Sequence, residues 1–197
     1  MSTSEQKRKV ILVTDGDRIA RRAVEKAAGN IGGRCISASA GNPTPIDGEK
    51  IVDLIKTAAH DPVVVMFDDK GSCRRGRGEK ALEYVVSHPD LEVMGVLAVA
   101  SNTESIEGIC VDCAVTKYKQ VVNGQVDKEG NLISGNNIVM GDTVDVLNEF
   151  DEQKVPFVIG MGDVGKMEGK DDAADGAEVT TKAFQTIIEH WQSRQAH

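Results

Sequence analysis

The chain has 197 residues and a formal net charge of −8, from 23 Lys and Arg against 31 Asp and Glu. Its 40% hydrophobic and 27% charged residues are typical of a folded globular protein and exclude a disordered one. The acidic balance argues against nucleic-acid binding, which depends on neutralising phosphates. The most apolar stretch, residues 93–100, is too short to cross a bilayer, and the N-terminus shows no secretory signal. We therefore expect a soluble, intracellular protein that does not insert into a membrane.

The first part of the chain alternates between strand and helix patterns. Residues 9–14 form a nearly continuous apolar run, typical of a strand buried on both faces. Residues 19–31 carry apolar side chains at helical spacing, with Asp17 as the predicted N-cap and Gly32-Gly33 as the helix end. The alternation then continues with a strand at 34–39, a helix at 51–58, a strand at 63–67, a helix at 79–87 and a strand at 93–100.

The pattern changes in residues 110–139. Short β-branched stretches are separated there by Asn123-Gly124, which predicts a hairpin turn, and by the turn-forming residues 129–131. We interpret the region as an antiparallel excursion at one edge of a sheet. Beyond it, the sequence predicts a helix at 142–150, a strand at 156–160 and a C-terminal helix at 180–192.

Strands that alternate with helices over short connections imply right-handed crossovers and a parallel sheet. The predicted fold is therefore α/β: a three-layer, doubly wound sandwich with a mostly parallel central sheet and the antiparallel edge excursion. We expect a flexible N-terminus at residues 1–8 and one α/β domain over residues 9–197.

The four cysteines are Cys35 and Cys73, which stand alone, and Cys110 and Cys113, which form a Cys-x-x-Cys pair. A structural zinc site needs four ligands, and no histidine has the matching spacing. The pair lies in a predicted strand, where its two side chains need not face the same way. Reduced thiols are the favoured interpretation, and a redox or metal role is the alternative.

Acidic residues follow several of the predicted strands. Asp15 and Asp17 follow the first strand, Asp68 and Asp69 follow the third, and Asp163 follows the last. If the strands are parallel, these loops meet at the carboxyl edge of the sheet, where open α/β folds bind ligands. Carboxylate oxygens are preferred ligands of hard cations, so this edge is a candidate Mg²⁺ or Ca²⁺ site. The alternative is that each Asp is an ordinary turn or helix-capping residue.

A basic, glycine-rich segment at residues 70–80 precedes a predicted helix. Its Arg74, Arg75 and Arg77, together with free backbone N–H groups, are candidates for binding a phosphate or carboxylate. The P-loop pattern Gly-x-x-x-x-Gly-Lys-Ser/Thr is absent. The alternative is a solvated loop whose arginines pair with nearby Asp residues.

Residues 160–172 form a long glycine- and charge-rich segment after the last strand, and a loop of this length is often functional. It is a candidate lid over the carboxylate edge, or a surface excursion that becomes ordered against a partner. The sequence contains no Gly-x-Ser-x-Gly elbow, and no histidine stands beside a candidate nucleophile in a recognisable motif. We therefore expect a protein that is not an enzyme.

Seven segments form a combination that is much more specific than any one of them: residues 10–17, 32–37, 39–45, 60–69, 95–102, 141–148 and 160–167. Together they resemble the stage V sporulation protein AE family over nearly the whole chain. The resemblance implies the hydrophilic AE subunit encoded with the SpoVA proteins of spore-forming Firmicutes. That set moves calcium dipicolinate into the developing spore and releases it on germination.

The resemblance further implies a soluble accessory that contacts other SpoVA proteins at the spore inner membrane. It carries over no catalytic residues and no cofactor. A weaker, fold-level resemblance is to Toprim domains, which hold Mg²⁺ for phosphoryl transfer with a Glu and an Asp-x-Asp motif. Asp15 and the Asp68-Asp69 pair occupy similar places, but Lys70 stands where the second spaced Asp would be.

The Toprim resemblance supplies the alternative function, a metal-dependent phosphoryl-transfer enzyme or a phosphate-ligand-binding protein. A third hypothesis is that the carboxylate edge binds calcium dipicolinate as a sensor.

Overall fold

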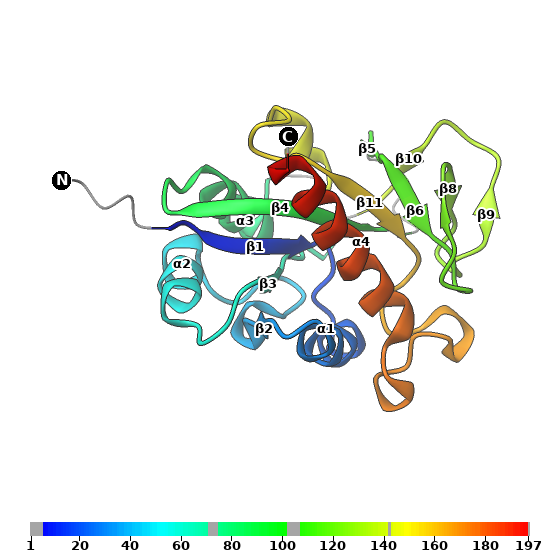
Figure 1. The fold of residues 1–197 in the computed structure, drawn as a ribbon, viewed down its shortest axis with the longest axis horizontal. Helices are drawn as coiled ribbons and strands as arrows, with labels where there is room; N and C mark the ends of the chain where they lie inside the picture. Colours follow the sequence, from blue (N-terminus) through cyan, green and yellow to red (C-terminus); the bar gives the residue numbers. More distant parts are fainter. Residues whose placement is uncertain (1–5, 71–74, 102–106, 142, 197) are drawn as a thin grey trace.

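A seven-stranded sheet forms the centre of the computed structural model, which describes residues 6–70, 75–101, 107–141 and 143–196 (Figure 1). In chain order the elements are β1 (Arg8–Val13), α1 (Arg18–Asn30), β2 (Arg34–Cys35), η1 (Ser37–Ser39), α2 (Gly48–Thr57), β3 (Val63–Met66), α3 (Arg77–Ser87), β4 (Leu91–Val99), β5 (Ile109–Cys110), β6 (Cys113–Val115), β7 (Val121–Val122), β8 (Gln125–Val126), β9 (Leu132–Ile133), β10 (Ile138–Val139), η2 (Asp145–Glu149), β11 (Val158–Met161), η3 (Met167–Gly169), η4 (Ala173–Asp175) and α4 (Glu178–Gln195).

The sheet has the strand order β2-β3-β1-β4-β11-β6-β7, and its pairs are parallel except that of β7 with β6. Successive side chains of a strand point to opposite faces, so the apolar runs found in the sequence supply two cores. Val10 and Leu12 of β1 belong to the core that includes α2 and α3. Ile11 and Val13 belong to the core that includes α1 and α4. The predicted three-layer α/β fold is confirmed, and Figure 1 shows α4 in front of the sheet and α3 behind it.

Helix α1 illustrates how the sequence pattern produces a layer. The Asp17 carboxylate accepts hydrogen bonds from the N–H groups of Ile19 (2.7 Å) and Ala20 (2.8 Å), which confirms the predicted N-cap. The buried face of the helix consists mostly of alanine, which allows the helix to approach the sheet closely. Arginine and glutamate side chains occupy the opposite face, where Arg21 pairs with Glu25.

The connections that leave the strands run toward opposite edges of the sheet on the two sides of β1, although the strands themselves stay parallel. The chain passes from β1 through α1 to β2 near one edge of the sheet, and later from β3 through α3 to β4 on the other side of β1. Helices α2 and α3 cover the face opposite α1, as right-handed crossovers require when the direction reverses. The carboxyl ends of β1 and β4 therefore form a topological switch point, where α/β folds place their ligands.

Two predicted elements are shorter than expected. The strand predicted at residues 34–39 ends at Cys35 and continues as the 3₁₀ helix η1. The hydroxyl of Ser39 donates to the Ile36 carbonyl (2.7 Å) and accepts from the Met66 N–H (2.9 Å), so a side chain replaces the backbone pairing that would extend the strand. The predicted helix at 142–150 is the 3₁₀ helix η2, and Asp142 lies outside the described residues. Residues 1–5 of the N-terminal segment also lie outside them, and β1 begins at Arg8.

The excursion at residues 110–139 contains the expected antiparallel pairs, but the predicted hairpin at Asn123-Gly124 is wrong. Strand β7 before this turn pairs with β6, whereas β8 after it pairs with β9. The hairpins are closed instead by residues 116–120, between β6 and β7, and by residues 127–131, between β8 and β9, where the Asp127 side chain accepts the Asn131 N–H (2.8 Å). Strand β6 itself pairs in parallel with β11, so it belongs to the central sheet.

The cysteines in the described part of the chain carry free thiols. Cys110 lies on β5 and Cys113 on β6, in different sheets, and Cys73 lies outside the described residues. Burial, followed by the charge of Asp112, raises the pKa of Cys113 to about 11. Such a thiol is protonated at neutral pH and is a poor nucleophile.

Candidate functional site

A pocket of about 170 Å³ lies at the carboxyl edge of the sheet, at the switch point between β1 and β4. Four of the five predicted carboxylates line it: Asp15, Asp17, Asp68 and Asp163. The remaining lining residues are Thr14, Asn42, Val99, Ala100, Ser101 and Lys128. We call this group of residues the carboxylate pocket. Its walls come from the loops after β1, β2, β3, β4 and β11 and from the loop after β8, as the parallel topology requires.

The loop after β1 is fixed by hydrogen bonds to β4 and by a close contact with the loop after β2. The Thr14 hydroxyl accepts the Val99 N–H (3.0 Å), and the Thr14 N–H donates to the Leu97 carbonyl (3.1 Å), which locks the end of β1 to β4. The next turn requires glycine, because a Cβ on Gly16 would lie 2.8 Å from the Gly41 carbonyl oxygen. Asp15 is thereby held against the loop after β2, at a defined position in the pocket wall.

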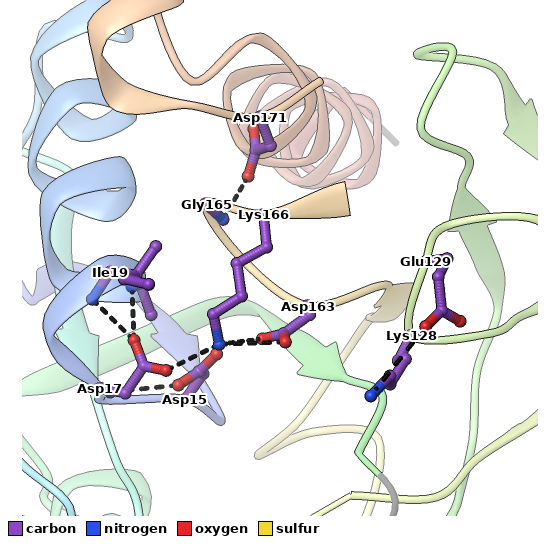
Figure 2. A network of polar contacts seen from close by, with 10 residues as sticks. Asp15, Asp17, Ile19, Lys128, Glu129, Asp163, Gly165, Lys166 and Asp171 are labelled. Carbon is purple, nitrogen blue, oxygen red and sulfur yellow. Dashed lines mark hydrogen bonds and ion pairs between the residues drawn. The ribbon is translucent and has the colours of Figure 1, made fainter. Parts of the chain in front are cut away.

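Lys166 links two of the carboxylates across the pocket edge (Figure 2). Its ammonium group lies 2.9 Å from the Asp17 carboxylate and 3.0 Å from that of Asp163. Burial works against the charged forms, but the hydrogen bonds outweigh it: the pKa of Asp17 is lowered and the pKa of Lys166 is raised. Asp17 has a second role as the N-cap of α1, so the helix start and the pocket edge share one side chain.

Asp15 has the most unusual environment of the pocket. Burial, then the charge of Asp17, with smaller contributions from Asp163 and Asp68, raise its pKa from 3.8 to about 7. The Asp17 N–H donates to one Asp15 oxygen (3.2 Å) and opposes the shift. Figure 2 shows Asp15 joined to Asp17, which is linked in turn to Asp163 through Lys166. A carboxyl group whose pKa is raised this far by burial and by neighbouring charges is typical of functional sites.

A fully buried carboxylate outside the pocket holds Lys166 in place. Asp171 accepts hydrogen bonds from the N–H of Gly165 (2.8 Å), the N–H of Thr180 (2.8 Å) and the hydroxyl of Thr180 (2.6 Å). These bonds connect the residues before Lys166 to the start of α4. Val164 and Met167 are also buried, so the segment 160–172 is a packed wall of the pocket.

Asp68 and Asp69 are neighbours in the sequence but have different roles. Asp68 is buried in the pocket wall, and its backbone N–H donates to the Thr44 hydroxyl (2.9 Å). The Asp69 carboxylate instead accepts the N–H groups of Gly78 and Glu79, both at 2.7 Å, and caps α3. The helix-capping alternative thus describes Asp69, which does not line the pocket.

Arg75 and Arg77 of the candidate anion loop do not line the carboxylate pocket, and Arg74 lies outside the described residues. Arg75 pairs with Glu149 (2.7 Å) and Glu83 (3.6 Å). Arg77 donates to the Pro45 carbonyl (2.8 Å). These contacts link the start of α3 to two neighbouring segments.

Sequence reasoning missed the two lysines of this site, Lys128 and Lys166. The spacing of three residues between Asp163 and Lys166 is the one available signal, because it suits an ion pair within a turn. With four carboxylates and these two lysines, the site carries a formal charge of −2 when every group is ionised. Within the described ranges, no group of three or more His, Cys, Asp or Glu is arranged to hold a metal ion directly.

The fold and site define an α/β protein with an acidic pocket at the switch point of a parallel sheet. Residues 9–191 match the family model of stage V sporulation protein AE1, and the chain belongs to this family of sporulation proteins. No curated protein and no solved structure matches the chain, so the Toprim resemblance stays a prediction. None of the helices in the described part of the chain is long and apolar enough to span a bilayer.

Proposed function

We propose that the protein is a non-enzymatic accessory of the SpoVA calcium-dipicolinate channel system, in sporulation and in spore germination. It acts by contact with the membrane-embedded SpoVA proteins at the surface of the spore inner membrane. Family membership supports the role in sporulation. One surface of the structure has the composition that a contact role requires.

That surface is the β7–β9 edge, which consists of Tyr118, Val121, Leu132 and Ile133. Their side chains are 62%, 44%, 57% and 36% exposed, and they account for four of the six exposed large hydrophobic residues in the described part of the chain. Exposed apolar residues concentrated in one region are typical of protein contact sites. This concentration is the observation that carries the proposal.

The two segments of the β7–β9 edge are connected through the backbone. The Lys117 N–H donates to the Gly130 carbonyl (2.8 Å), which brings the segment before β7 next to the turn before β9. In the described sheets, β7 is an end strand and β9 pairs with β8 alone. Figure 1 shows β8 and β9 beyond β6, at the end of the molecule away from the N-terminus. End strands offer unpaired backbone groups, so a partner segment gains both apolar contact and strand pairing there.

Co-purification from sporulating cells tests the proposal. The tagged full-length chain is recovered from detergent-extracted spore membranes, and SpoVA membrane proteins are detected by mass spectrometry. We expect them with the wild type and a large loss with Tyr118→Lys/Leu132→Lys. The matched control is Tyr84→Lys, which changes an exposed tyrosine on α3 (45% exposed) away from the edge. No association with the wild type, together with normal germination after deletion of the gene, would exclude the contact role.

A further inference from the structure

The Asn123-Gly124 dipeptide lies between β7 and β8 but closes no hairpin, because these two strands do not pair with each other. We propose that it is a modification site, at which Asn123 loses its side-chain amide spontaneously and becomes a carboxylate, assisted by Asn137. The reaction consumes water and needs no enzyme. The modification itself is independent of the contact function proposed above, whereas its effect on a partner rests on that function.

Gly124 makes the attacking nitrogen accessible. Glycine has no Cβ beside its N–H group and adopts many backbone conformations, so it hinders ring closure by a preceding asparagine less than any other residue. Gly124 belongs to no helix or strand, and its N–H donates a hydrogen bond to no residue that the structure describes. Asn123 is exposed, so water reaches its side chain. The nucleophile, the amide carbon and water therefore meet at this dipeptide.

Asn137 activates the side chain of Asn123. Its Nδ2 group donates a hydrogen bond to the Asn123 Oδ1 atom (3.1 Å). A donor at this oxygen stabilises the negative charge that the oxygen gains when the neighbouring Cγ atom is attacked. The backbone of Asn137 is fixed, because its carbonyl accepts the Val111 N–H (2.7 Å). Its φ of 55° lies in the left-handed region, which asparagine tolerates better than most residues.

The reaction balances with water as the one co-reactant. A solvent base removes the proton of the Gly124 N–H, and the nitrogen forms a bond to the Cγ atom of Asn123. The Cγ–Nδ2 bond breaks, and Nδ2 takes a proton from water and leaves as ammonia, so that a succinimide ring remains. Water then opens the ring at Cγ, which gives aspartate, or at the main-chain carbonyl carbon of the same residue, which gives isoaspartate. Either product carries one negative charge.

The new charge lies beside the β7–β9 edge. Gly124 packs against Leu132 of this edge, because a Cβ on Gly124 would lie 2.9 Å from the Leu132 Cδ1 atom. Residues 120–126 and 130–141 contain no Asp, Glu, Lys or Arg, so a carboxylate at Asn123 introduces the first formal charge into either segment. An apolar partner that covers the edge must then remove water from this charge, which costs free energy. The modification therefore weakens contact at the edge.

Mass spectrometry of the purified full-length chain, incubated at pH 8 and at pH 6, tests the inference. Trypsin cleaves after Lys119 and Lys128, and the peptide 120–128 contains Asn123 as its only asparagine. We expect this residue to convert to aspartate and isoaspartate with time, and more slowly at pH 6, because the attacking nitrogen must lose its proton. Asn30 precedes isoleucine, and its side chain donates to the Gly176 carbonyl and the Thr181 hydroxyl, so it should remain intact.

Two matched variants test the part played by Asn137. Asn137→Asp keeps the shape of the side chain but removes the donor, so conversion of Asn123 should slow by about fivefold, the effect of one hydrogen bond. Asn136→Asp adds the same charge one residue earlier and keeps the hydrogen bond, so conversion should match the wild type. Circular dichroism verifies that both variants fold. Absence of time-dependent conversion in the wild type overturns the inference, and equal rates in the two variants overturn the assistance by Asn137.

Co-purification from sporulating cells separates the effect of the modification from the contact function itself. Asn123→Asp carries the product charge and should recover less SpoVA membrane protein than the wild type does. Asn123→Gln is the uncharged control and should recover as much as the wild type. Undiminished recovery with Asn123→Asp overturns the effect of the modification on the contact. Absence of SpoVA protein with the wild type contradicts the contact function, whereas the chemistry at Asn123 is decided by mass spectrometry alone.

Discussion

The carboxylate pocket and the β7–β9 edge differ in how the backbone supports them. The pocket lies where parallel strands end, and its loops are fixed by hydrogen bonds between segments far apart in the sequence, such as Thr14 with Val99. The edge is built from strands of two residues that pair antiparallel with short neighbours. Its side chains are apolar and exposed, whereas those of the pocket are mostly polar.

This difference suits the two regions to different kinds of ligand. A rigid polar pocket is suited to a small charged ligand, because its groups are positioned before the ligand arrives. An apolar strand edge is suited to another polypeptide, because a partner strand supplies the missing hydrogen bonds. Mutations in one region should therefore leave the other unaffected, and the following predictions are ordered by expected effect.

The largest effect is expected for Asp171→Ala, which removes the anchor of the pocket wall. The N–H groups of Gly165 and Thr180 and the Thr180 hydroxyl would lose their buried acceptor. We expect the free energy of unfolding to fall by about 3–5 kcal/mol in urea denaturation. Asp171→Asn keeps one acceptor oxygen and should lose less. A loss below about 1 kcal/mol for Asp171→Ala would show that the wall does not depend on this anchor.

The second effect is pH-dependent and concerns Asp15→Asn. The pKa of the Asp15 carboxyl is 3.8 in the unfolded chain and about 7 in the folded protein. Between these two pH values the folded state of the wild type therefore binds more protons than the unfolded state does. Stability of the wild type therefore falls as the pH rises through this window, and asparagine removes the loss. Without divalent cations, we expect the variant to be more stable by about 2–4 kcal/mol at pH 8.

Thermal and urea unfolding of this variant at pH 5 and pH 8 measure the difference. The advantage of Asp15→Asn should shrink toward pH 5, where most of the wild-type carboxyl in the folded state is protonated. An advantage of equal size at both pH values would contradict the raised pKa. Asp53→Asn serves as the control, and its stability should follow the wild type across the range.

A third prediction contrasts two neighbours in the β8–β9 hairpin. Val126 and Leu132 are paired in register, but Val126 is buried (1% exposed) and Leu132 is 57% exposed. Val126→Ala should lower the free energy of unfolding by about 1–3 kcal/mol through the lost packing. Leu132→Lys should change it by less than about 0.5 kcal/mol. A large loss of stability from Leu132→Lys in urea denaturation would show that this side chain supports the fold, and that the edge is not a free surface.

The smallest effect is expected for Arg75→Ala. Its ion pairs with Glu149 and Glu83 are exposed and screened by water, so the free energy of unfolding should change by less than about 0.5 kcal/mol. Urea denaturation measures the change, and a loss above about 1 kcal/mol would show that these ion pairs support the fold.

The sequence predicts the parallel sheet well because its strands are buried on both faces. The apolar runs at the start of the chain and at residues 63–67 have no polar face, so they do not fit an amphipathic surface helix. The loops after parallel strands of this kind must meet at one edge of the sheet. That topology is the reason why Asp15, Asp68 and Asp163 come together although they are far apart in the chain. The N-cap role of Asp17 follows from local chemistry alone.

Details that depend on side-chain direction could not be predicted. Asp68 and Asp69 are the same residue type in adjacent positions, and the tertiary path of the chain decides which of them faces the pocket. Lys166 reaches the site because Asp171 fixes the loop before it, and no local pattern encodes this contact. Asn123-Gly124 is a good hairpin signal, but the strands on either side of it do not pair with each other. Strand β7 pairs with β6 in the central sheet, and β8 pairs with β9 in a separate sheet.

The most direct test of the contact role compares three tagged forms of the chain from sporulating cells: the wild type, Tyr118→Lys/Leu132→Lys and Asp15→Asn. The amount of membrane-embedded SpoVA protein that co-purifies with each is measured by quantitative mass spectrometry. We predict equal recovery with the wild type and Asp15→Asn, and a large loss with the edge variant. Undiminished recovery with the edge variant, or none with the wild type, would contradict a contact role for the β7–β9 edge.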